Sequence, residues 1–249
     1  MAANEYPPLY TGSHGEAEQY GETELWEKSF RENVSCARAI EKAIRDSAGD
    51  GDDIKPDCAK AVLDEYGLKR TCFVLAHSVR ELGPLVKPSE ETQKWSWQFD
   101  HSRDRDYGRY YRADTALAHL EAFIGQVRDA YQALGLPGKE QCDSAAWDRS
   151  LVGSVLVLSP NVLRESCWSA EDMLWLAEGG FGTEPDSRGR AVYAVNVYDG
   201  ERTRWNREDF VGVLDERYLP GWAKENLAAL RAPEQGQKEN GGPAMDGIG

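Results

Sequence analysis

The sequence lacks the patterns on which most membrane proteins and many enzyme classes depend. It has no apolar run of about 18 residues or more, so we expect no transmembrane helix. Gly-Lys-Ser/Thr phosphate loops, G-x-S-x-G nucleophile elbows and HExxH or Cys/His ligand clusters are all missing. We therefore expect no catalytic residue, no metal and no cofactor, and a protein that is not an enzyme.

Cysteines and targeting signals are also scarce. The five cysteines are odd in number and form no CxxC pair, which favours reduced thiols over disulfides. The first residues, MAANEYPPLY, carry neither the basic nor the apolar region of a signal peptide. These absences predict a cytoplasmic protein without a membrane partner.

Basic residues are too few to balance the acidic ones. Lysine and arginine number 29 against 43 aspartates and glutamates, which gives a formal net charge of -14. Because the phosphates of nucleic acid must be met by lysine and arginine, this balance disfavours broad, nonspecific binding of nucleic acid. It agrees with an acidic surface that meets a basic partner, or with one that keeps the protein soluble.

Apolar residues at helical spacing dominate the first half of the chain. An extended arm over residues 1–13 precedes the first helix. Residues 84–111 look irregular, with Trp95 and Trp97 as anchors, and Asp114 is expected to cap the helix that follows. The helices are expected at about residues 22–46, 56–66, 69–81 and 114–134.

The second half changes to strand-like patterns. SVLVL, residues 154–158, predicts a buried strand, and RAVYAVNVY and ERTRW flank an Asp-Gly hairpin signal. Ser169 and Asp172 resemble a capping box and predict a helix through Leu176. A further strand is expected near Phe210, and Pro220 opens a final helix.

These patterns predict a mainly α fold with two domains. A helical N-terminal domain covers residues 1–136, and a linker follows over 137–149. A small α+β domain with an antiparallel hairpin covers residues 150–231. Residues 232–249 are polar and rich in Gly and Pro, so we expect a disordered tail.

A Gly-rich stretch, EGGFGTEPDSRGR, runs from Glu178 to Arg190. A phosphate-binding glycine loop follows a strand and precedes a helix, whereas these glycines are expected to follow a helix. Gly179 would then end that helix as a left-handed residue. We favour a structural turn, with Arg188 and Arg190 able to meet a carboxylate or phosphate of a partner.

Arginine and tyrosine interleave in RDRDYGRYYR, residues 103–112. Arginine can meet phosphate while tyrosine stacks on a base, although the two aspartates in this stretch halve its charge. The hairpin arginines could join such a site. The candidate nucleic-acid or partner contacts are Arg103, Arg105, Arg109, Tyr110, Tyr111, Arg112, Arg188, Arg190, Arg202 and Arg204.

Six glutamates crowd a 17-residue stretch that leads into the first predicted helix. One interpretation is a solvated helix face, and the other is a negative surface that imitates a phosphate backbone and occupies a basic groove of a partner. The residues in question are Glu16, Glu18, Glu22, Glu24, Glu27 and Glu32.

Several segments resemble a known family. YPPLY, ETELWEKSFRENVSCARAIEKAI, DCAKAVLDEYGLKRTCFVLAHSV and TALAHLEAFIGQVRDAY, over about residues 6–133, resemble the domain of unknown function 3849 family of bacterial conjugative and mobile elements. LVLSPNVL, GGFG, RAVYA, DGERTRWNREDF and LPGWAKENL, over about 151–230, resemble a second module of the same elements. The resemblance supplies no catalytic residue and implies a setting of mobile DNA, in which accessory proteins counter host defences.

The function expected from this setting is inhibition without catalysis. The protein would bind a host defence nuclease or another nucleic-acid-binding protein, in the manner of anti-CRISPR or anti-restriction proteins, through its acidic surface. The alternative is an accessory factor that contacts nucleic acid directly during transfer or maintenance of the element.

Overall fold

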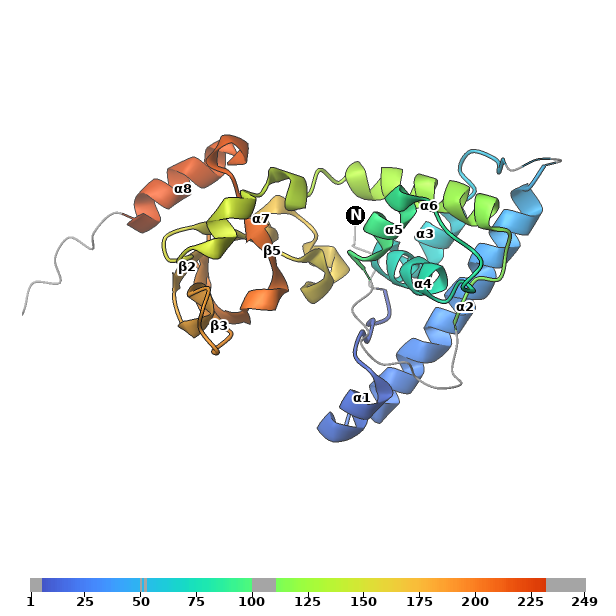
Figure 1. Ribbon diagram of the computed structural model, residues 1–249, viewed down its shortest axis with the longest axis horizontal. Helices are drawn as coiled ribbons and strands as arrows, with labels where there is room; N and C mark the ends of the chain where they lie inside the picture. The colour runs from blue at the N-terminus through green and yellow to red at the C-terminus, as the bar shows by residue number, and fades with distance from the viewer. Residues whose placement is uncertain (1–5, 50, 52, 100–110, 232–249) are drawn as a thin grey trace, which may run out of the picture. The chain divides into compact units, whose positions relative to one another are not determined.

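The computed structural model describes residues 6–49, 51, 53–99 and 111–231. The chain divides into two compact units (Figure 1). We call Met1–Gly138 together with Leu158–Met173 the helical unit. Lys139–Val157 together with Leu174–Gly249 form the sheet unit. The prediction of a helical domain followed by a small α+β domain is confirmed.

Helices build the helical unit, as the spacing of apolar residues predicts. Along the longest helix, α2, the side chains of Trp26, Ala37, Ile40 and Ile44 are buried. Ala37, Ile40 and Ile44 belong to a core in which Leu75, Phe123 and other apolar side chains are also buried. The helices are α1 (His14–Tyr20), α2 (Thr23–Ser47), α3 (Lys60–Tyr66), α4 (Leu68–Arg80), α5 (Glu90–Ser96), α6 (Leu117–Gln132) and α7 (Ala170–Met173).

Three details of the helical prediction were wrong. Helix α5 lies within the segment expected to be irregular, where the Ser89 hydroxyl accepts the Thr92 N–H and caps the helix. Trp95 on α5 is buried as an anchor should be, but Trp97 is 71% exposed. Asp114 does not cap α6, because the helix begins after Ala116 and has no side-chain cap.

The segment Leu158–Met173 joins the helical unit although strands precede and follow it. Trp168 packs edge-to-face on Tyr131 of α6 and donates its indole N–H to the carbonyl of Pro160 at 2.7 Å. Lys69 of α4 donates to the carbonyl of Leu163 at 2.6 Å. The domain boundaries expected from the sequence instead place residues 158–173 in the α+β domain, residues 150–231.

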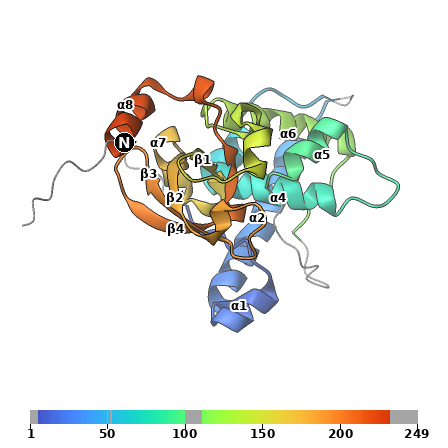
Figure 2. The ribbon, with the colours of Figure 1, turned by 60° about the vertical axis from the view of Figure 1, so that its left-hand side comes forward.

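A five-stranded sheet forms the centre of the sheet unit (Figure 2). Its order is β4-β3-β2-β1-β5, and the β1–β2, β2–β3 and β3–β4 pairs are antiparallel. The elements are β1 (Val155–Leu158), β2 (Leu174–Gly179), β3 (Ala191–Asn196), β4 (Arg202–Asn206), β5 (Phe210–Val213) and α8 (Gly221–Arg231). Short 3₁₀ helices cover Lys139–Gln141, Ser144–Asp148, Pro160–Val162, Glu165–Cys167, Phe181–Thr183, Arg207–Asp209 and Glu216–Tyr218.

The helix expected through Leu176 was wrong beyond its first turn. The capping interaction exists, since the Ser169 hydroxyl accepts the Asp172 N–H, but α7 ends at Met173. Strand β2 then begins at Leu174 and pairs on one side with β1 and on the other with β3. Gly179 therefore ends a strand and is not a helix cap.

The Gly-rich stretch packs closely on β3. A Cβ atom at Gly180 would overlap the carbonyl oxygen of Ala191, and one at Gly182 would overlap that of Arg190. The expected order of helix, glycines and strand was wrong, so the ground given above for preferring a structural turn is lost. The close packing of Gly180 and Gly182 on the backbone now supports that preference instead. These glycines permit close approach of two backbone segments.

Candidate functional site

Helix α1 and the first turns of α2 form a hairpin that stands apart from the other helices of its unit. Figures 1 and 2 both show α1 beside the first turns of α2 and away from α3 to α6. Ser13 caps α1 in a capping box, and Gly21 ends it in the left-handed conformation with φ 72°. Trp26 holds the hairpin together, since its ring packs on those of His14 at 4.7 Å and Phe30 at 5.2 Å.

Two of the six candidate glutamates serve the fold. Glu16 accepts the Ser13 N–H at 2.8 Å and completes the capping box. Glu22 accepts the Tyr10 hydroxyl at 2.9 Å. Burial and this hydrogen bond raise the pKa of Tyr10 to about 12, so the phenol stays a donor. These two carboxylates thus fix the arm and the hairpin.

Three of the glutamates face solvent near the turn of the hairpin. Glu18, Glu24 and Glu27 are exposed, whereas Glu32 is half-buried farther along α2. Two large apolar side chains flank the same turn, Tyr20 with 68% and Leu25 with 55% of their surface exposed. We call Glu18, Tyr20, Glu24, Leu25 and Glu27 the hairpin tip. Apolar anchors with charged neighbours are typical of protein interfaces.

The Arg/Tyr stretch contributes less to an exposed site. Arg103, Arg105, Arg109 and Tyr110 lie outside the described residues. Tyr111 packs inside the helical unit, with its ring stacked on His77 at a centroid distance of 4.0 Å. Arg112 donates to the carbonyl of Glu81 at 3.1 Å and pairs with Asp114 at 3.1 Å.

The hairpin arginines divide into paired and free ones. Arg190 forms an ion pair with Glu208 at 2.8 Å, and Arg202 one with Glu178 at 3.1 Å. Arg188 and Arg204 are exposed and form no ion pair within the described part of the chain. Arg204 lies opposite Tyr193, which is 53% exposed, in the β3–β4 ladder.

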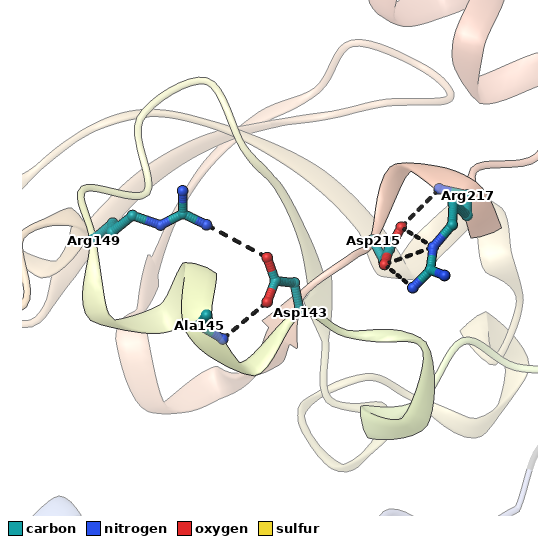
Figure 3. Close-up of polar contacts among 5 residues, drawn as sticks. All are labelled: Asp143, Ala145, Arg149, Asp215 and Arg217. Atoms are coloured by element: carbon teal, nitrogen blue, oxygen red, sulfur yellow. Dashed lines mark hydrogen bonds and ion pairs between the residues drawn. The ribbon is translucent and has the colours of Figure 1, made fainter.

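Two neighbouring carboxylates of the sheet unit are held by their own turns (Figure 3). An isolated bridge between Cys142 and Leu214 brings Asp143 and Asp215 onto adjacent segments. Asp143 accepts the Ala145 N–H at 2.9 Å and pairs with Arg149 at 3.4 Å. Asp215 accepts both the backbone N–H and the guanidinium of Arg217, which lowers the pKa of Asp215 to about 2. Both carboxylates are therefore engaged by residues of their own turns.

Sequence reasoning missed a group of charged residues half-buried or buried around the start of α4. Glu165 accepts the backbone N–H of Leu68, and burial raises the pKa of its carboxyl. Burial lowers the pKa of Lys69 to about 8. A Cβ at Gly67 would overlap the Glu165 carboxylate. Glu165 is distant from these residues in the sequence, so no local sequence pattern predicts its contact with the start of α4.

Two cysteines and one histidine of the helical unit are buried in its core or nearly so. Burial raises the pKa of Cys36 to about 12 and that of Cys72 well above the ordinary value. Burial, followed by the charge of Arg80, lowers the pKa of His77 to about 3. These side chains belong to the core and are poorly suited to attack or to proton transfer at neutral pH.

Among residues 6–99 and 111–231, apart from positions 50 and 52, no group of three or more His, Cys, Asp or Glu side chains could hold a metal. None of the helices in that part of the chain is long and apolar enough to cross a membrane.

Comparison with known proteins gives a family match for the N-terminal part of the chain. A search of curated proteins and a search of solved structures find none. Residues 9–132 match the model of the family described as "Protein of unknown function (DUF3849)", and these residues include helices α1 to α6. The helical N-terminal part of this chain therefore carries that domain of unknown function.

Proposed function

We propose that this protein is a non-enzymatic accessory protein of a mobile genetic element that binds and inhibits a host nucleic-acid-targeting defence protein, of the anti-CRISPR or anti-restriction type. The observation that carries the proposal is the hairpin tip, which presents three exposed carboxylates beside two exposed apolar side chains. The mobile-element setting comes from the sequence resemblance described above.

The chemistry of the tip fits a basic groove with apolar contacts. Tyr20 and Leu25 would supply the desolvated anchors, which usually carry most of the binding energy of an interface. Glu18, Glu24 and Glu27 would stand where the partner expects phosphates and would speed encounter with it. Glu16 and Glu22 would contribute indirectly, because their carboxylates hold the hairpin in shape.

The test is an inhibition assay with substitutions at the tip. The full-length protein is added to DNA cleavage reactions of a restriction endonuclease and of an RNA-guided nuclease. Replacing Glu18, Glu24 and Glu27 with glutamine should weaken inhibition about tenfold, and replacing Tyr20 and Leu25 with alanine should weaken it at least as much.

A matched control removes the same charge elsewhere. Glu140, Glu216 and Glu225 are exposed, and their side chains form no ion pair within the described residues. Their triple glutamine variant should inhibit as the wild type does. If both triple variants inhibit as well as the wild type, the acidic tip is not the binding surface.

A nucleic-acid-binding accessory role is the second candidate. It is favoured by Arg188 and Arg204, which are exposed, and by the exposed rings of Tyr193 and Phe181. Arginines with exposed aromatic rings suit single-stranded nucleic acid. A gel shift with a single-stranded oligonucleotide tests it, and the absence of a shift at low salt would exclude it.

A further inference from the structure

The outward face of α2 carries a regular row of basic side chains. The row runs through positions spaced alternately by three and four residues, which places its members on one stripe of a helix. All of them are exposed, and the stripe lies opposite the buried side chains of Ala37 and Ile40. We call this set the basic row; its members are Lys28, Arg31, Arg38, Lys42 and Arg45.

The charges of the basic row are not neutralised by the fold. None of its side chains forms an ion pair or a hydrogen bond within the described parts of the chain. Between Lys28 and Arg45 the only other position on the stripe is Ser35. Three acidic residues lie at the ends, Glu24 and Glu27 before the row and Asp46 after it.

Two further carboxylates flank the row, those of Glu32 and Glu41, and both residues are half-buried. Glu41 accepts the backbone N–H of Asp114 at 2.7 Å, so it is directed to the chain itself. The row therefore offers a line of cationic groups, with Ser35 between Arg31 and Arg38, to whatever approaches α2 from solvent.

The dimensions of the row match a nucleic-acid backbone. At about 1.5 Å per residue, the distance along the helix axis from Lys28 to Arg45 is about 25 Å. Along a duplex, each strand presents one phosphate per about 3.4 Å of axis, so the row spans roughly seven base pairs.

The composition of the row disfavours three other occupants on physical grounds. It contains no apolar or aromatic side chain, so it offers neither the anchors of a protein interface nor rings on which single-stranded bases stack. A second copy is disfavoured as well. An α2 laid antiparallel about Ser35 would set Lys28 near Lys42 and Arg31 near Arg38.

We propose that the basic row of α2 binds the sugar-phosphate backbone of duplex nucleic acid without reading its sequence. Contacts to phosphates position a protein on a duplex, whereas groove contacts are needed for specificity. The net charge of the chain does not forbid this, because charges more than about 8 Å away are largely screened at physiological salt. The site adjoins the hairpin tip but shares no residue with it, and it does not rest on the inhibitor proposal.

The experiment measures binding of the full-length protein to a labelled DNA duplex by fluorescence anisotropy. Five phosphate contacts predict that affinity falls about 500-fold from about 50 mM to about 200 mM salt. The triple variant Arg31→Gln, Arg38→Gln and Lys42→Gln should bind at least tenfold more weakly. It should also reduce the slope of log affinity against log salt by about three.

The matched control changes net charge equally. Lys87, Arg164 and Lys224 are exposed, and their side chains form no ion pair within the described residues. Their triple glutamine variant should bind the duplex as the wild type does. Circular dichroism of both variants verifies folding, since glutamine is a good helix former at exposed positions.

Four results would overturn the proposal. These are no duplex binding by the wild type at about 50 mM salt, equal weakening in both triple variants, unchanged binding in the basic-row variant, and tighter binding to phosphatidylserine vesicles or to polyglutamate than to the duplex. Failure of the inhibition assay would leave these outcomes unaffected, because the tip variants retain the basic row.

Discussion

Replacing Arg70 with methionine should lower the free energy of unfolding of the helical unit by about 3 kcal/mol. Arg70 lies on α4 and is only 2% exposed, and burial lowers the pKa of its guanidinium. The guanidinium donates to the carbonyl of Ser29 at 3.1 Å and to the side chain of Asn33, both on α2. It also donates to the carbonyls of Pro7 and Pro8 at 3.0 Å each, so it ties the N-terminal arm to two helices.

The magnitude follows from what the methionine variant leaves behind. Methionine retains the apolar stem, so packing changes little. Pro7 and Pro8 are exposed, and their carbonyls can bond to water instead. Asn33 is 3% exposed and would stay buried without its donor, at a cost of about 1–3 kcal/mol. Each lost hydrogen bond to a charged donor lowers the free energy of unfolding by about a further 1.5–3 kcal/mol. Part of this loss is offset, because the variant no longer buries a charged guanidinium.

The assay is urea unfolding of the full chain, followed by hydrogen exchange resolved by peptide, because the two units need not unfold together. Residues 6–13 and α2 should exchange faster in Arg70→Met. Arg38→Met is the control, since Arg38 is exposed on α2 and its loss should change stability by less than about 0.5 kcal/mol. If Arg70→Met unfolds at the wild-type urea concentration with an equally protected arm, the guanidinium does not anchor it.

Two further predictions concern pH and close packing. The pKa of His77 falls from 6.5 to about 3 on folding, so between these values the unfolded state binds a proton that the native state does not. Acidification from about pH 6.5 to about pH 5 should therefore lower the free energy of unfolding by roughly 1.5 kcal/mol more in wild type than in His77→Gln. Equal pH profiles of the two proteins would contradict this. Gly182→Ala should destabilise the sheet unit by about 2 kcal/mol because its Cβ would overlap a backbone carbonyl, whereas Gly179→Ala, with open space around it, should cost less in thermal unfolding.

Local patterns were sufficient for the long helices but not for β2. An unbroken apolar run from Met173 to Ala177 begins four residues after Ser169, and such a run fits a buried helix as well as a buried strand. Pairing decides the case, because Leu176 lies opposite Val155 on one side and Val195 on the other. Those partners are distant in the sequence, so the strand is fixed by the tertiary structure.

The candidate site likewise combines features that the sequence predicts with features that depend on the tertiary structure. The exposed carboxylates of the hairpin tip could be listed from composition, but Tyr20 and Leu25 stand out only once their exposure is known. The basic row could have been predicted from the sequence, because its residues have helical spacing and lie opposite the apolar positions of the same helix. The excess of acidic residues in this part of the sequence drew attention to the glutamates instead. Arg70 gave no signal, because it sits in an apolar helix and bonds to backbone carbonyls far along the chain.

The excursion of Leu158–Met173 into the helical unit has a consequence for the order in which the protein can be made. The chain passes between the two units three times, after Gly138, after Val157 and after Met173. During synthesis, the carboxylate that bonds to the start of α4 and the indole that covers Tyr131 therefore leave the ribosome only after β1. A fragment that stops at residue 136 lacks both groups, so the N-terminal unit reaches its final form only after β1 has been synthesised.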